Sequence, residues 1–111
     1  MKQYTTQEQT AKLIELGFER PKSMAEYDLP AGDWRIGSVG IRKAYSIGEL
    51  IEMLPRYIED KGATIDIGFD MFSWVIAYLN IPQEYVYCTS GLELIDALYE
   101  MIIKLKEEKL L

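Results

Sequence analysis

A nine-residue pattern, S-x-x-E-L-I-(D/E)-x-L, occurs twice in the chain, at residues 46–54 and 90–98. In each copy the Ser hydroxyl can accept the backbone N–H three residues on, and the Glu at that position can accept the Ser N–H. This reciprocal arrangement is the capping box, which marks a helix N-terminus ahead of an apolar run. The pattern therefore predicts one helix from Ser46 to Pro55 and another from Ser90 to about Glu108.

The two copies do not indicate a repeat architecture. A repeat array needs three or more units, and only one partial match is present. We interpret the pattern as the same helix-start chemistry used at two places.

Length and composition favour one ordered domain over residues 1–111, since 49% of the residues are hydrophobic and 12% are aromatic. The longest uncharged run, residues 71–83, is too short to span a membrane. The polar N-terminus carries no apolar signal segment, and the single Cys88 cannot form an internal disulfide. These features predict a soluble cytoplasmic protein.

The pattern of elements predicts an α+β fold: a single antiparallel sheet of three to five strands with about three helices packed on it. Apolar and polar residues alternate over residues 64–70, which indicates a strand with one buried face. The apolar run 72–79 predicts a second strand, and residues 85–88 a third. A further helix is expected to start near Thr5 or Thr6, with a capping box over residues 5–8, and to end at Gly17.

Smaller features complete the expected fold. Residues 57–58 are expected to continue a helical turn, and residues 19–45 to hold short strands around a turn at 29–33. The expected core is Leu13, Leu16, Leu50, Ile51, Leu54, Ile65, Ile67, Trp74, Ile76, Leu94, Ile95, Leu98 and Ile102.

The predicted last helix is more apolar than one sheet face can cover. Its outward stripe is narrow and consists of Glu93, Asp96, Glu100, Lys104 and Glu107. Because one sheet covers an apolar stripe only about 100° wide, either the first two helices flank this helix or a second subunit does. The sequence therefore predicts a protein partner or self-association. The candidate interface residues are Trp74, Ile76, Tyr78, Tyr99, Met101 and Ile103.

Few residues could carry chemistry. The chain has no His, which removes the commonest general base and metal ligand, and one Cys, which we expect to be a buried structural thiol. The stripe Glu93, Asp96 and Glu100 could clamp a cation, but a solvated polar face explains it equally well. We predict no catalytic, cofactor-binding or metal-binding residue.

Charge disfavours nucleic acid as a partner. Residues 44–103 carry ten acidic and two basic residues, a net charge of −8, which has the wrong sign for phosphate backbones. The segment Gly37–Gly40 matches a GxxG motif, a weak nucleic-acid signal. The composition does not indicate a small-molecule ligand.

Three segments together support a resemblance: residues 9–18, residues 45–55 and residues 93–101. In this order they resemble a family of small uncharacterised proteins of gut Bacteroidales, often encoded in prophage-like or mobile regions. The resemblance implies an accessory role in a mobile element and transfers no catalytic residue.

Three functions from different classes therefore remain open. The first is a small non-enzymatic interaction or accessory protein. The second is an acidic inhibitor that mimics nucleic acid and occupies a host DNA-binding protein, which requires the carboxylates to gather on one surface. The third is an enzyme that uses carboxylates alone, which requires a pocket holding two or more of them.

Overall fold

The computed structural model describes residues 3–21, 44–80 and 84–111. The elements in chain order are α1 (Gln7–Glu15), α2 (Ile47–Met53), β1 (Tyr57–Ile58), the 3₁₀ helix η1 (Glu59–Lys61), β2 (Ala63–Asp70), β3 (Ser73–Leu79), β4 (Tyr85–Gly91) and α3 (Leu94–Glu107). The expected strands around residues 29–33 and the GxxG motif at 37–40 lie outside the described residues.

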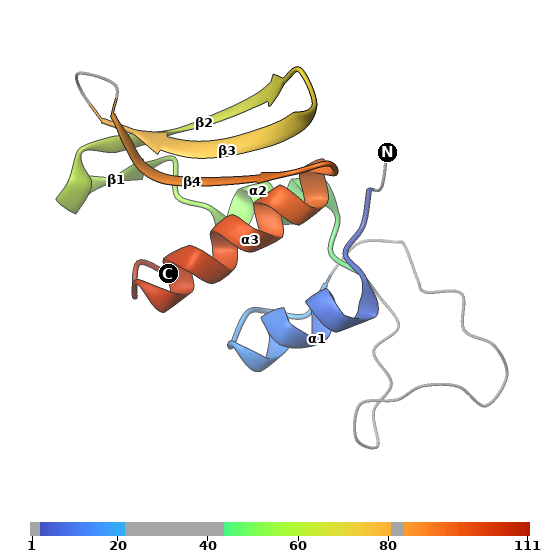
Figure 1. The fold of residues 1–111 in the computed structure, drawn as a ribbon. Coiled ribbons are helices and arrows are strands. Elements are labelled where there is room, and N and C mark those ends of the chain that lie inside the picture. Colours follow the sequence, from blue (N-terminus) through green and yellow to red (C-terminus); the bar gives the residue numbers. More distant parts are fainter. Residues whose placement is uncertain (1–2, 22–43, 81–83) are drawn as a thin grey trace, which may run out of the picture.

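The four strands form one antiparallel sheet in the order β1-β2-β3-β4, so each strand pairs with its neighbour along the chain. The helices lie on one side of this sheet (Figure 1). The predicted α+β fold, with one antiparallel sheet and three helices, is confirmed. The alternation over residues 64–70 corresponds to β2, and the apolar run 72–79 corresponds to β3.

The prediction of a helical turn at residues 57–58 is wrong, because Tyr57 and Ile58 pair with Thr64 and Ala63 as β1. The chain has already left the helical region at Leu54, which has extended φ and ψ angles before Pro55. Proline cannot continue the helix ladder. The residues beyond it are therefore free to pair with the sheet.

The first two helices begin with capping boxes. In α2 the Ser46 hydroxyl accepts the Glu49 N–H, and the Glu49 carboxylate accepts the Ser46 N–H, as the pattern predicts. In α1 the box is formed by Thr6 and Gln9, one residue later than the predicted box at residues 5–8. Gly17 ends α1 with a φ of 99°, a conformation that favours glycine.

The prediction of a helix start at Ser90 is wrong. Ser90 pairs with Val75 and Gly91 pairs with Trp74, so β4 extends three residues beyond the predicted strand 85–88. The helix α3 starts instead after Glu93, whose carbonyl oxygen accepts the N–H groups of Asp96 and Ala97. Pairing with β3 satisfies the backbone around Ser90, and this tertiary contact outweighs the local capping signal.

The surplus apolar surface of α3 is covered within the chain. On one side α2 packs against α3, and the sheet covers it through β4 and β3. On another side α1 is linked to it, because the Gln9 side-chain amide donates to the Asp96 carboxylate over 2.8 Å. The Lys106 ammonium lies 5.5 Å from the centre of the Phe18 ring, just beyond the end of α1. The first of the two alternatives therefore holds: the first two helices flank α3 (Figure 1).

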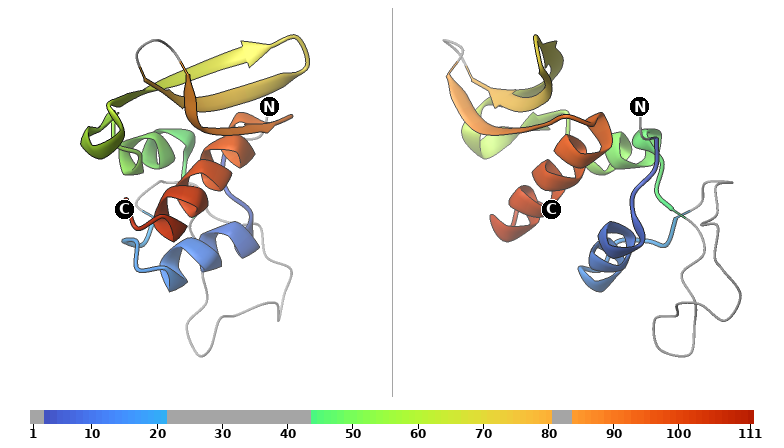
Figure 2. Two further views of the ribbon diagram at one scale, coloured as in Figure 1. Left: turned by 60° about the vertical axis from the view of Figure 1, so that its left-hand side comes forward. Right: turned by 45° about the vertical axis from the view of Figure 1, so that its right-hand side comes forward.

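The core lies between α3, α2 and the strands β3 and β4. Eight of the predicted core residues are buried: Leu13, Leu50, Leu54, Ile76, Leu94, Ile95, Leu98 and Ile102. Leu16, Ile65, Ile67 and Trp74 are only half-buried, and Ile51 is exposed. Three of these five predictions, those for Ile51, Ile65 and Ile67, fail for one reason. The helices cover β3 and β4, whereas β2 curls away from them (Figures 1 and 2).

Candidate interaction surface

The six predicted interface residues divide into two groups. Ile76, Tyr78 and Met101 are fully buried within the chain, so they belong to the core and offer no surface to a partner. Trp74, Tyr99 and Ile103 are half-buried. The pKa of Tyr99 is raised by burial and by the nearby carboxylates of Glu100 and Glu8. Since Glu8 belongs to α1, this effect indicates that the Tyr99 side of α3 is the side that α1 covers.

Four large exposed apolar side chains of the described residues lie elsewhere, at the end of the sheet where β2 turns into β3. Phe69 is 60% exposed, Met71 79%, Phe72 78% and Leu92 82%. Together with the half-buried Trp74 they form what we call the hairpin-end surface. Four side chains of this size expose on the order of 500 Å² of apolar area. A patch of this extent on a monomer often has a function.

The register of three strands brings these residues together. Phe69 pairs with Trp74 across β2 and β3, and their rings meet edge to face with centroids 5.1 Å apart. Trp74 pairs in turn with Gly91 of β4, and Leu92 follows directly. Met71 and Phe72 form the two-residue turn between Asp70 and Ser73. The hairpin-end surface therefore runs across the ends of all three longer strands.

The turn residues are not explained by the turn itself. Two-residue hairpin turns usually have positive φ angles and favour Asn, Asp or Gly. Neither Met71 nor Phe72 has a positive φ, and neither is a common turn residue. Both side chains are also largely exposed, so they do not contribute to the core. Neither local conformation nor packing accounts for two large apolar residues here.

The hairpin-end surface continues into a groove along β2. Ile65, Ile67 and Phe69 alternate along the strand, so their side chains lie on the same face. Between this face and α2 lies an open cavity of about 590 Å³, which is also lined by Ile51, Glu52, Leu54 and Arg56. This cavity we call the β2 groove. It exists because β2 curls away from the helices, as both views in Figure 2 show.

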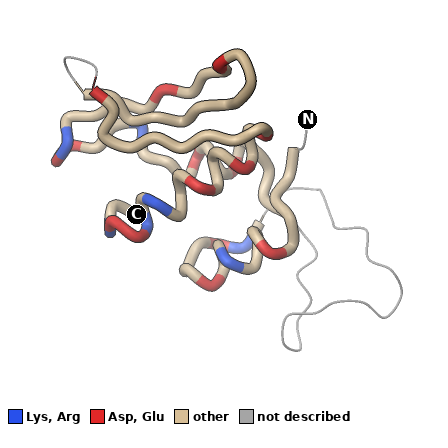
Figure 3. Tube along the Cα trace, viewed as in Figure 1, with Lys and Arg blue, Asp and Glu red and all other residues tan. Residues whose placement is uncertain are grey.

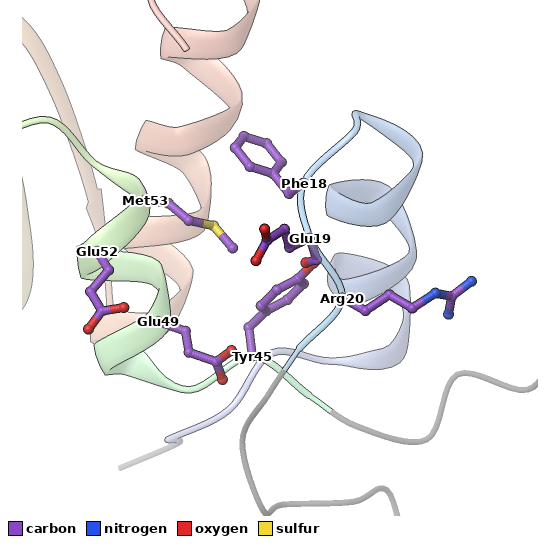
Figure 4. Close-up of a pocket in the computed structure, with 7 residues that line it drawn as sticks. All are labelled: Phe18, Glu19, Arg20, Tyr45, Glu49, Glu52 and Met53. Carbon is purple, nitrogen blue, oxygen red and sulfur yellow. The ribbon is translucent and has the colours of Figure 1, made fainter.

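A second cavity of about 370 Å³ lies between the end of α1 and α2 (Figure 4). Glu49 and Glu52 line it, so two carboxylates do share a pocket. The Glu49 carboxylate is already engaged with the Ser46 backbone and hydroxyl in the capping box. Arg20 extends away from the other lining residues. Acid–base catalysis needs two groups free to reach one substrate, and this arrangement commits one of them to the fold.

Among the described residues, the carboxylates are distributed over α1, α2, η1, β2 and α3 and do not form a single cluster (Figure 3). Within the part of the chain that the structure describes, no group of three or more His, Cys, Asp or Glu side chains could hold a metal ion.

Cys88 is exposed, contrary to the expectation of a buried thiol. It pairs with Ala77 on the face of β4 that points away from the helices.

No protein-family model, no curated protein and no solved structure matches this chain. Over residues 3–21, 44–80 and 84–111, no helix is long and apolar enough to cross a membrane.

Sequence reasoning missed the hairpin-end surface, although one signal for it was present. The tetrapeptide from Asp70 to Ser73 joins two clear strands with Met and Phe where turn-forming residues are expected. A turn composed of large apolar residues indicates a contact beyond the turn. Leu92 carried no such signal, because the sequence placed it inside a helix.

Proposed function

We propose that this protein is a non-enzymatic interaction module that binds a partner protein through its hairpin-end surface. The observation that carries the proposal is the Met71-Phe72 turn. Its two side chains are about four-fifths exposed and serve neither turn geometry nor the core. Exposed aromatic and Met side chains are enriched in protein interfaces.

A protein partner is favoured over a membrane surface by the charges at this end. Asp70 precedes the turn and Glu93 follows Leu92, and the whole chain carries a net charge of −6. Anionic lipid headgroups repel such a surface. An acidic nucleic-acid mimic is not favoured, because its carboxylates would have to gather on one face. An accessory role in a mobile element and a cytoplasmic location remain predictions from the sequence.

Site-specific photo-cross-linking tests the proposal. A benzophenone amino acid is placed at Phe72 in one sample and at Lys104, exposed on α3, in a matched control. After irradiation in native lysate, we expect a discrete cross-linked protein from position 72 and none from position 104. Cross-linking that is absent at 72, or equal at both positions, would contradict the proposal.

A pair of variants tests whether the apolar side chains carry the binding. Met71→Ser with Phe72→Ser should abolish capture of the cross-linked partner and leave the unfolding free energy within about 0.5 kcal/mol, because both residues are exposed. Tyr85→Ser, at an exposed aromatic residue at the other end of the sheet, is the control and should bind normally. Met71 and Phe72 could instead be required only for binding to lipid vesicles, or only for association between copies of this chain. Either result would overturn the assignment of this surface to a partner protein.

A further inference from the structure

We propose that β2 accepts an extended segment of the partner protein as an additional antiparallel strand. The segment would carry apolar residues toward the β2 groove and basic residues on the opposite face. This inference rests on the proposed function and names the kind of partner that the surface fits. Four features of β2 support it: a free edge, outward backbone groups, an uncovered apolar face and a pair of carboxylates.

The edge of β2 is only partly occupied. On that side β1 pairs with Ala63 and Thr64, and the Ile65 N–H donates to the Arg56 carbonyl oxygen over 3.0 Å. From residue 66 to residue 70, no other strand of the described chain pairs with this edge. Free edges of this kind are the places where proteins accept a strand from another chain.

The direction of the free backbone groups follows from the register. In an antiparallel strand, alternate residues direct their N–H and C=O groups to opposite sides. The Ile65 N–H points toward β1, so the backbone groups of Ile67 and Phe69 point to the same side, away from β3. Each residue has one donor and one acceptor, so this edge offers two N–H and two C=O groups to an added strand.

The side of β2 that faces the helices is apolar and incompletely covered. Ile65 and Ile67 are half-buried and Phe69 is 60% exposed, beside the β2 groove and the exposed Ile51 of α2. A strand paired with β2 would place alternate side chains over this surface. Those side chains would therefore be apolar.

The other side of β2 carries Asp66 and Asp70, with Gly68 between them. The adjacent strands β3 and β4 contain no Lys or Arg, so no neighbouring strand supplies a positive charge for these carboxylates. Side chains directly opposite each other on paired strands interact, and opposite charges stabilise the pair. Two basic residues four positions apart on the added strand would face both carboxylates.

The same charges disfavour a second copy of this chain as the occupant. Antiparallel pairing of the free edge 66–70 with itself would set Asp66 opposite Asp70, and would do so twice across the two-fold axis. Like charges in this position are destabilising. The edge is therefore suited to a partner strand of opposite charge.

A designed peptide tests the inference directly: acetyl-Thr-Lys-Val-Thr-Val-Lys-Thr-amide, labelled for fluorescence anisotropy. Its two Lys would face Asp70 and Asp66, and its two Val would pair with Phe69 and Ile67. We expect saturable binding that weakens with added salt, with slower hydrogen exchange at the Ile67 and Phe69 amides. N-methylation of both Val residues should abolish binding, because it removes the donors toward β2. No binding up to about 1 mM peptide, or undiminished binding of the N-methylated peptide, would overturn the proposal.

Matched variants separate charge recognition from general acidity. Asp66→Asn with Asp70→Asn should weaken peptide binding at least about tenfold, whereas Glu59→Gln with Asp60→Asn, the same charge change on η1, should leave it unchanged. Equal loss in both pairs would contradict specific pairing. The two proposals can fail separately: cross-linking at Phe72 reports the hairpin-end surface, and peptide binding reports the β2 edge. Partner capture without peptide binding would reject strand addition alone.

Discussion

The Tyr78 hydroxyl donates a hydrogen bond to the Pro55 carbonyl oxygen over 2.6 Å. This contact joins the end of β3 to the chain just beyond α2, where the helix gives way to β1. The ring of Tyr78 is fully buried, and burial raises the pKa of its hydroxyl to about 12. The hydrogen bond therefore anchors the point at which α2 meets the sheet, and it makes this point sensitive to alkaline pH.

Tyr78→Phe should destabilise the protein at neutral pH by about 1–2 kcal/mol, because the Pro55 carbonyl loses its donor. The raised pKa predicts the pH dependence. Below pH 10 the hydroxyl is protonated in both the folded and unfolded states; between pH 10 and 12 only the folded state retains the proton. Wild type should therefore lose about 1.4 kcal/mol by pH 11, the midpoint of this window, relative to Tyr78→Phe. Urea unfolding of both proteins at pH 8 and pH 11 measures the difference, and an unchanged difference would refute it.

The duplicated pattern provides a matched pair of substitutions. Ser46→Ala removes the hydroxyl that caps α2 by accepting the Glu49 N–H. It should lower the free energy of unfolding by about 1 kcal/mol. Ser90→Ala changes an exposed residue of β4 that caps nothing, and should change the unfolding free energy by less than about 0.5 kcal/mol. Denaturant unfolding of the two variants decides the point. Equal losses would mean that Ser90 does cap a helix.

The corner between β4 and α3 needs a glycine. A Cβ atom at Gly91 would lie 3.3 Å from the Glu93 carbonyl oxygen and 3.4 Å from the Ala97 nitrogen. Gly91→Ala should therefore cost about 1 kcal/mol through crowding. Gly68→Ala in β2 is the control, because no atom lies within 4 Å of the added Cβ, and it should be neutral or slightly stabilising. Thermal unfolding compares the two; a stable Gly91→Ala variant would show that the corner can widen.

The end of α1 depends on backbone conformation rather than on space. Gly17 has a φ of 99° and no atom within 4 Å of an added Cβ. Gly17→Ala should cost about 1–2 kcal/mol, because L side chains disfavour this conformation. By contrast, Gly48 inside α2 does not have a positive φ, and an added Cβ would make an ordinary van der Waals contact, 3.8 Å from the Ser46 hydroxyl oxygen. Gly48→Ala should therefore stabilise the folded protein by about 0.5–1 kcal/mol. Urea unfolding of both variants tests the opposite signs, and a shared sign would contradict the assignment.

Local signals predicted those elements whose residues are satisfied locally. The Ser46 capping box and the Gly17 helix end depend on contacts within a few residues, and the alternation in β2 depends on one partially covered face. The Ser90 copy failed because its residues pair with Val75 and Trp74, some 15 residues earlier in the chain. No pattern within residues 90–98 contains that information.

In the candidate site, too, local sequence predicts some features, and the others depend on contacts between distant parts of the chain. The apolar excess of α3 correctly indicated that more than the sheet must cover this helix, but α1 and α2 supply the cover. The apolar surface that the helices do not cover lies on β2, because that strand curls away from them. The twist of a sheet accumulates over several paired strands, so its extent cannot be derived from one strand alone. A single sequence therefore identified Phe69 as part of a strand without showing that it is exposed.

The strand order also has a consequence for the time course of folding. Each strand pairs with the next along the chain, so the sheet assembles by closing short loops. In contrast, the hydrogen bond from Gln9 to Asp96 joins residues 87 positions apart. Since long loops close more slowly and later, we expect the sheet and α3 to gain hydrogen-exchange protection first during refolding, and α1 to dock last.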